Sequence, residues 1–114
     1  MKKVELYTFE DIKGDLDKGL SDSEVAIKKW KSILDALSSI EEVSLQLTSF
    51  CLKYQNLGCK DCPIVRYDYP CGHPYAIFTI FYQELRKLRM IAENLYAILV
   101  AIDREDRESR KHYV

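Results

Sequence analysis

Apolar residues recur at intervals of three and four along two long segments, and no glycine or proline follows Pro74 in the second segment. This period matches the 3.6 residues of a helical turn, so each segment is predicted to form amphipathic helix. In the first segment the apolar positions are Ala26, Trp30, Ile33, Leu37, Ile40, Leu47, Cys51 and Tyr54. In the second they are Ile77, Phe81, Leu85, Leu88, Ile91, Leu95, Leu99 and Ile102. The spacing therefore predicts an all-α fold.

Local signals divide the chain into four parts. Ser21-x-x-Glu24 has the form of a capping box, so a first helical arm is expected over 21–57, with Ser38-Ser39 as a potential break. Pro74 suits the first turn of a second helical arm over 74–112. The cysteine-rich connecting loop then occupies 58–73.

An irregular N-terminal arm is expected over 1–20. Within it, Thr8 and Asp11 could cap one turn of helix.

The 114 residues are enough for one helical domain. A long helical hairpin would leave apolar residues beside the main stripe of the second arm in water, among them Phe78, Ile80, Ile98 and Val100. A four-helix bundle-like arrangement would cover them, either by breaks within one chain or by pairing of two chains. We therefore expect a homo-oligomer, a dimer or larger.

Composition limits the possible partners and the compartment. The net charge is −1, so neither nucleic acid nor an anionic membrane is an expected partner. No segment has the length of apolar sequence that a membrane span needs, and the first residues do not resemble a signal peptide, so a cytoplasmic location is expected. Asn and Gln are rare, which is typical of thermophilic proteins. Because some thermophiles form disulfides inside the cell, disulfides remain an alternative for the cysteines.

All four cysteines lie in the spacing Cys51-x7-Cys59-x2-Cys62-x8-Cys71, and His73 follows two residues later. A Cys-x2-Cys pair lets one tight turn present two thiolates to a single ion, and Zn²⁺ prefers four nitrogen or sulfur ligands. Cys71 would be the third ligand of a structural Zn site, and Cys51 or His73 the fourth. One or two disulfides, an iron–sulfur or redox site, and unlinked thiols are the alternatives. A metal or a disulfide would hold the connecting loop in place.

Acidic residues on the two helical arms suggest a second kind of site. IEEVSLQL contains Glu41 and Glu42, and AENLYAILVAI contains Glu93 within a leucine-rich run. These segments resemble the EExxE and ExxD helices of the all-α NTP pyrophosphatases, the group of MazG-like and dimeric dUTP-hydrolysing enzymes. The third acid of the first motif is replaced by Leu45, and the second acid of the later motif by Tyr96, or by Ala97 if the register shifts by one residue.

The resemblance implies a MazG-like helical fold and an oligomer. It also implies that Glu41, Glu42 and Glu93 hold Mg²⁺ against a nucleotide triphosphate for pyrophosphohydrolysis, with activity weak or absent because two acids of the pattern are missing. The alternative is a non-catalytic helical interaction protein whose cysteine cluster is a structural staple. In that case the three glutamates are surface residues of amphipathic helices.

Overall fold

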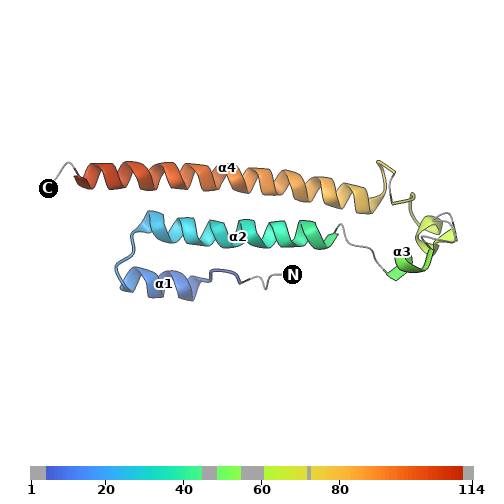
Figure 1. Ribbon diagram of the computed structural model, residues 1–114, viewed down its shortest axis with the longest axis horizontal. Helices are drawn as coiled ribbons and strands as arrows, with labels where there is room; N and C mark the ends of the chain where they lie inside the picture. Colours follow the sequence, from blue (N-terminus) through green and yellow to red (C-terminus); the bar gives the residue numbers. More distant parts are fainter. Residues whose placement is uncertain (1–4, 45–48, 55–60, 72, 112–114) are drawn as a thin grey trace. The chain divides into compact units, whose positions relative to one another are not determined.

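The computed structural model describes residues 5–44, 49–54, 61–71 and 73–111. Its helices are α1 (Phe9–Asp17), α2 (Asp22–Ser44), α3 (Ser49–Tyr54), the 3₁₀ helix η2 (Pro63–Arg66) and α4 (Ile77–Lys111) (Figure 1). No strand occurs in these ranges, which confirms the all-α prediction.

The chain divides into two compact units. Unit 1 contains Met1–Ser39 and Leu88–Val114, and unit 2 contains Ile40–Lys87. Unit 1 therefore holds α1, most of α2 and the C-terminal part of α4. Unit 2 holds α3, η2 and the first turns of α4.

The N-terminal arm is not irregular, because it contains α1. The capping box that starts this helix confirms the capping role predicted for Thr8 and Asp11. The Asp11 amide donates to Thr8 Oγ1 (3.3 Å), and the Thr8 amide donates to Asp11 Oδ2 (2.8 Å). Gly19 follows α1 with a φ of 98°, a conformation that favours glycine, and it turns the chain towards α2.

The start of α2 lies where the sequence predicts it. The Glu24 amide donates a hydrogen bond to Ser21 Oγ (3.2 Å), as expected for an N-cap serine. The potential break at Ser38-Ser39 is wrong, since α2 continues to Ser44. A pair of serines lowers helix propensity by only a few tenths of a kcal/mol each, which packing of the surrounding apolar residues outweighs.

The second long helix begins slightly later than Pro74. The segment before it forms hydrogen-bonded turns in which the His73 amide donates to the Pro70 carbonyl (2.8 Å) and the Ala76 amide to the His73 carbonyl (3.0 Å). From Ile77, α4 is continuous to Lys111. Its charged end carries ion pairs one turn apart, Arg107 with Asp103 and Arg110 with Asp106, as the charge spacing predicts.

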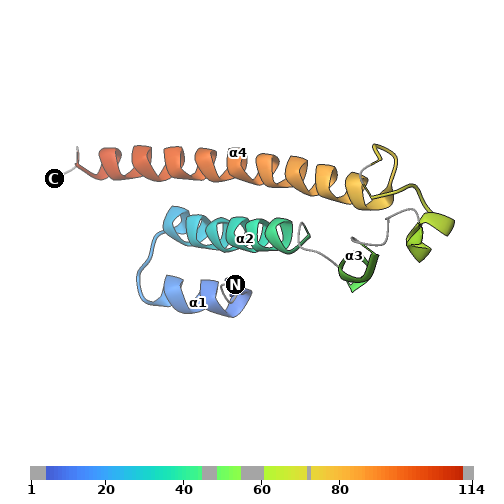
Figure 2. The ribbon, with the colours of Figure 1, turned by 45° about the vertical axis from the view of Figure 1, so that its right-hand side comes forward.

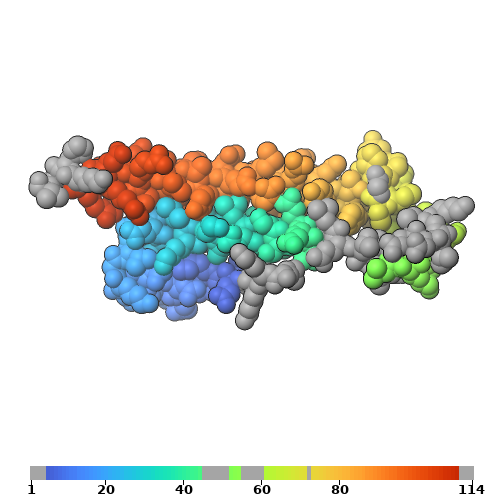
Figure 3. Space-filling view, viewed as in Figure 1, coloured from blue at the N-terminus to red at the C-terminus, as the bar shows by residue number. Residues whose placement is uncertain are grey.

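In unit 1, α2 lies between α1 and α4 (Figures 1 and 2). The Tyr7 amide donates to Ser32 Oγ (3.0 Å), which joins the segment before α1 to α2. On the other side of α2, Ser23 Oγ donates to Asp103 Oδ1 of α4 (2.7 Å). Figure 3 shows the atoms of these three elements in contact along the unit.

The buried apolar core is small. Among the described residues, it consists of Val25 and Ala92 in unit 1 and of Ala76 and Leu85 in unit 2. Many large apolar side chains are exposed instead, half of them on α4. Of the residues expected to lie in water, Phe78, Ile80 and Ile98 are exposed, whereas Val100 is half-buried.

Candidate functional site

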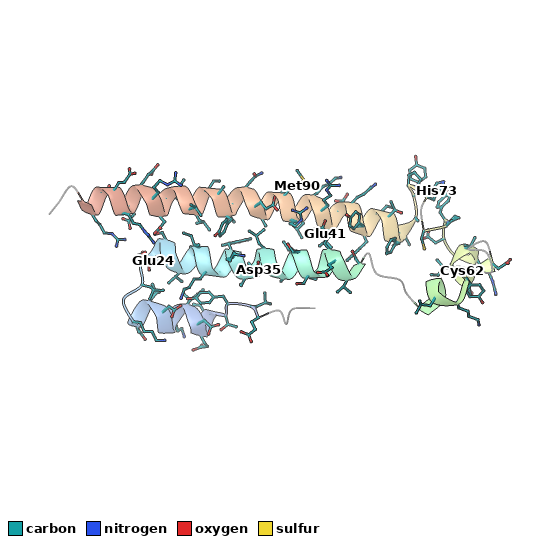
Figure 4. All side chains as sticks on the ribbon, in the orientation of Figure 1. Glu24, Asp35, Glu41, Cys62, His73 and Met90 are labelled. Atoms are coloured by element: carbon teal, nitrogen blue, oxygen red, sulfur yellow. The ribbon has the colours of Figure 1, made fainter. Side chains whose placement is uncertain are left out.

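The three glutamates of the nucleotide hypothesis occupy different environments. Glu41 is half-buried and Glu42 is exposed near the C-terminal end of α2, in unit 2 (Glu41 is labelled in Figure 4). Glu93 lies on α4 in unit 1, where its exposed carboxylate forms an ion pair with Arg89 one turn earlier. In the part of the chain that the structure describes, no three Asp, Glu, His or Cys side chains form a group that could hold a metal ion.

The cysteines are only partly described. Cys59 and the side chain of Cys51 lie outside the described residues. Cys62 is half-buried at the N-cap of η2 and forms no disulfide, whereas Cys71 is exposed. The predicted linkage of Cys59, Cys62 and Cys71 by a metal, with Cys51 or His73 as the fourth ligand, stays a prediction, and so does a disulfide between Cys51 and Cys59.

His73, the alternative fourth ligand, is engaged with its neighbours in the loop. Its ring stacks on Tyr69, with 4.2 Å between centroids and 12° between planes. Its Nδ1 accepts a hydrogen bond from the Tyr75 amide (3.1 Å). Because Nδ1 is the acceptor, the ring proton lies on Nε2, so His73 could bind a metal through either nitrogen only if this hydrogen bond were lost. Figure 4 shows His73 and Cys62 apart from each other in the connecting segment.

Asp68 orders the connecting segment, and sequence reasoning did not identify it. One carboxylate oxygen accepts from the Ile77 amide at the start of α4 (2.9 Å), and the other accepts from the Tyr69 amide (2.8 Å). Thr79 Oγ1 adds a bond to the Cys71 carbonyl (2.5 Å). An acid that caps a helix nine residues later has no spacing signal comparable with a capping box, so the sequence pattern could not reveal it.

An open groove of about 550 Å³ lies beside α1 and α2 in unit 1. Its polar groups bind one another: Tyr7 donates from its hydroxyl to Asp15, and Lys28 forms an ion pair with Asp15 (3.0 Å). Desolvation and the Asp15 carboxylate raise the pKa of Tyr7 to about 12. The hydrogen bonds from Tyr7 and Lys28 lower the pKa of Asp15. These pairings join α2 to the segment around α1 and leave no unsatisfied group aimed at a ligand among the buried side chains described.

Two parallel rows of residues run along α4 in unit 1. The row that we call the inner stripe is buried or half-buried and consists of Ala92, Tyr96, Leu99 and Asp103. Because Asp103 bonds to Ser23, the inner stripe faces α2. The row that we call the outer stripe consists of Leu88, Ile91, Leu95, Ile98 and Ile102.

The outer stripe is mostly exposed. Ile91 is 64% exposed and Ile98 is 56% exposed, and only Leu95 among the five is half-buried. The main stripe predicted for the second arm therefore combines residues of two environments: Leu85 and Leu99 are buried or half-buried, whereas Leu88, Ile91 and Ile102 are exposed.

Comparisons with family models, with curated proteins and with solved structures found no match to this chain. The resemblance to the all-α NTP pyrophosphatases accordingly stays a prediction. In the ranges that the structure describes, none of the helices has the length and apolar content to cross a membrane.

Proposed function

We propose that this protein is a non-catalytic helical interaction protein that acts by pairing the outer stripe of α4 with another apolar helix. The observation that carries the proposal is the exposure of four of the five aliphatic side chains of this stripe in the single chain. Contiguous exposed apolar surface usually marks an interface. A partner helix would complete the burial of these side chains, which contributes about 1 kcal/mol for each half-exposed residue.

The spacing of the outer stripe favours a helix as the partner. Leu88, Ile91, Leu95, Ile98 and Ile102 are separated alternately by three and four residues. This is the heptad repeat whose side chains fit between those of a facing helix. A groove for a small ligand would instead require convergent polar groups, and the stripe has none.

The nucleotide hypothesis requires a metal site built from residues of both long helices. Holding Mg²⁺ on a triphosphate would require Glu41, Glu42 and Glu93 to act on one ion, and Glu93 is paired with Arg89. Metal-assisted hydrolysis also depends on a site that fixes the geometry of the ion. The described residues contain no group of three ligands of this kind.

A pyrophosphate-release assay separates the two functions. With each common dNTP and Mg²⁺ or Mn²⁺, we expect the protein to release no more pyrophosphate than the variant Glu41→Gln/Glu42→Gln/Glu93→Gln, because no metal is held against the nucleotide. Circular dichroism of both proteins controls for folding. Turnover by the unmodified chain that disappears in the triple variant would replace the proposed function with the enzymatic one.

A further inference from the structure

We infer that the partner of the outer stripe is the outer stripe of a second copy of this chain, in antiparallel orientation about a two-fold axis. This inference rests on the proposed function, because it names the partner for the same surface. Three features of α4 support it: the angle between its two stripes, the acids that end the outer stripe, and the charges beside it.

The angle between the stripes suits a four-helix bundle. Each residue of the outer stripe from Ile91 onwards directly precedes a residue of the inner stripe, so the two stripes are about 100° apart around the helix. A helix in the corner of a square bundle contacts its two neighbours at nearly this angle. The inner stripe already contacts α2 of its own chain. We call the contact between the two outer stripes the seam. An antiparallel pair places both inner stripes on the same side of the seam, so the α2 helices of the two copies occupy the other two corners of the four-helix bundle.

The acids at the ends of the stripe oppose a parallel pair. Glu84 and Glu105 continue the spacing of the outer stripe by one step before Leu88 and one step after Ile102. In a parallel, in-register pair each would face the same glutamate of the second copy, and such juxtaposed like charges are unfavourable.

The antiparallel register avoids these pairs. Centred between Leu95 and Ile98, it places Leu95 against Ile98 of the second copy, and Ile91 against Ile102 of the second copy. Glu105 then lies near Leu88 of the second copy, where its aliphatic stem can pack while its carboxylate reaches water. The apolar layers occupy the centre of the seam and the acids its ends.

Charges beside the seam are complementary in the same register. Lys87 directly precedes Leu88, and Ala101 directly precedes Ile102, so both lie on the same edge of the outer stripe. Glu108 follows Ala101 by two helical turns on that edge. The Lys87 and Glu108 side chains are exposed, and Lys87 also forms an ion pair with Glu84 of its own helix (3.1 Å). In an antiparallel pair, Lys87 of each copy comes beside Glu108 of the other, which gives two opposite-charge contacts by symmetry.

Sedimentation velocity of the full chain tests the association. We expect a species of twice the 13.3 kDa chain mass. The variant Ile91→Glu/Ile98→Glu should raise the dissociation constant by roughly 100-fold or more, because each copy would bring two charges into the apolar seam. Met90→Glu is the matched control, since Met90 is 54% exposed and projects from α4 on the side away from α2 and off both stripes (Figure 4). It should leave the dissociation constant and the helical circular dichroism signal unchanged.

A photo-crosslinking residue, p-benzoylphenylalanine, at position 87 tests the orientation. We expect crosslinks between copies to map to the peptide around Glu108. Crosslinks to the region around residue 87 of the second copy would overturn the antiparallel arrangement. A chain that stays monomeric at all concentrations would overturn the second copy as partner, but it would leave the proposed function standing if the outer stripe is covered by another protein.

Discussion

Replacing Ala92 by glutamate is expected to lower the free energy of unfolding by about 3 kcal/mol or more. Ala92 is 4% exposed on the inner stripe, and its row faces α2 through Asp103 and Ser23. A glutamate there must either bury a charge without a partner or force the two helices apart. Since small domains are stable by only about 5–15 kcal/mol, this change should remove a substantial part of the stability of unit 1.

Ala97→Glu is the matched control for this prediction. Ala97 lies on the same helix and is exposed, so the same substitution should change stability by no more than about 0.5 kcal/mol. Urea unfolding followed by circular dichroism at one fixed protein concentration measures both variants, because association would make stability depend on concentration. Equal losses for the two alanines would mean that the inner stripe is not packed against α2.

Asp103→Ala is expected to cost about 2 kcal/mol. The Asp103 residue is 8% exposed, and its carboxylate accepts from Ser23 Oγ (2.7 Å) and pairs with Arg107 Nε (2.9 Å). Its removal leaves the half-buried Ser23 hydroxyl without this acceptor near the start of α2. Asp103→Asn should lose less, since the amide oxygen can still accept the bond from Ser23.

Asp106→Ala is the comparison for the ion-pair contribution. Asp106 pairs with Arg110 one turn later on the exposed side of the helix end, and exposed pairs of this kind contribute less than about 1 kcal/mol. The same urea experiment should therefore rank the losses as Asp103→Ala, then Asp103→Asn, then Asp106→Ala. A loss for Asp106→Ala as large as that for Asp103→Ala would contradict the role of Asp103 as a tether between α2 and α4.

The long helices could be predicted from sequence because their signals are local. The three-and-four spacing and the N-cap at Ser21 depend on residues within one or two turns, and both agree with α2 and α4. The length of α1 is greater than the single turn that the sequence predicts, because Gly14 and Gly19 lower the helix propensity around this nine-residue segment. The capping box of Thr8 and Asp11 was the signal that favoured it.

The faces of α4 could not be assigned from spacing alone. Leu88 and Ala92 are four residues apart, yet the first is exposed and the second is buried, because they belong to different stripes. Periodicity reveals that a helix has an apolar face, but two apolar stripes about 100° apart merge into one broad face in the sequence. Which stripe meets α2 depends on tertiary contacts such as the bond between Ser23 and Asp103.

The candidate site is less predictable from sequence than the fold, for physical reasons. Metal and nucleotide sites require side chains that are distant in sequence to converge, and Glu42 and Glu93 carry no local signal of convergence. The cysteine spacing is a local signal, but Cys59 and the side chain of Cys51 lie outside the described residues. Asp68, which does hold the connecting segment to α4, acts over a distance that no capping pattern covers.

Hydroxyl-radical footprinting of the chain in its native cell extract tests the central claim, that the outer stripe of α4 is an interaction surface. Side-chain oxidation, normalised to the intrinsic reactivity of each residue type, should be strongly reduced at Ile91 and Ile98 and unreduced at Met90, which has similar exposure in the single chain. Protection of Ile91 and Ile98 that disappears on dilution into denaturant would agree with the account. Oxidation of Ile91 and Ile98 at the same normalised level as Met90 would show that nothing covers the stripe, and would contradict it.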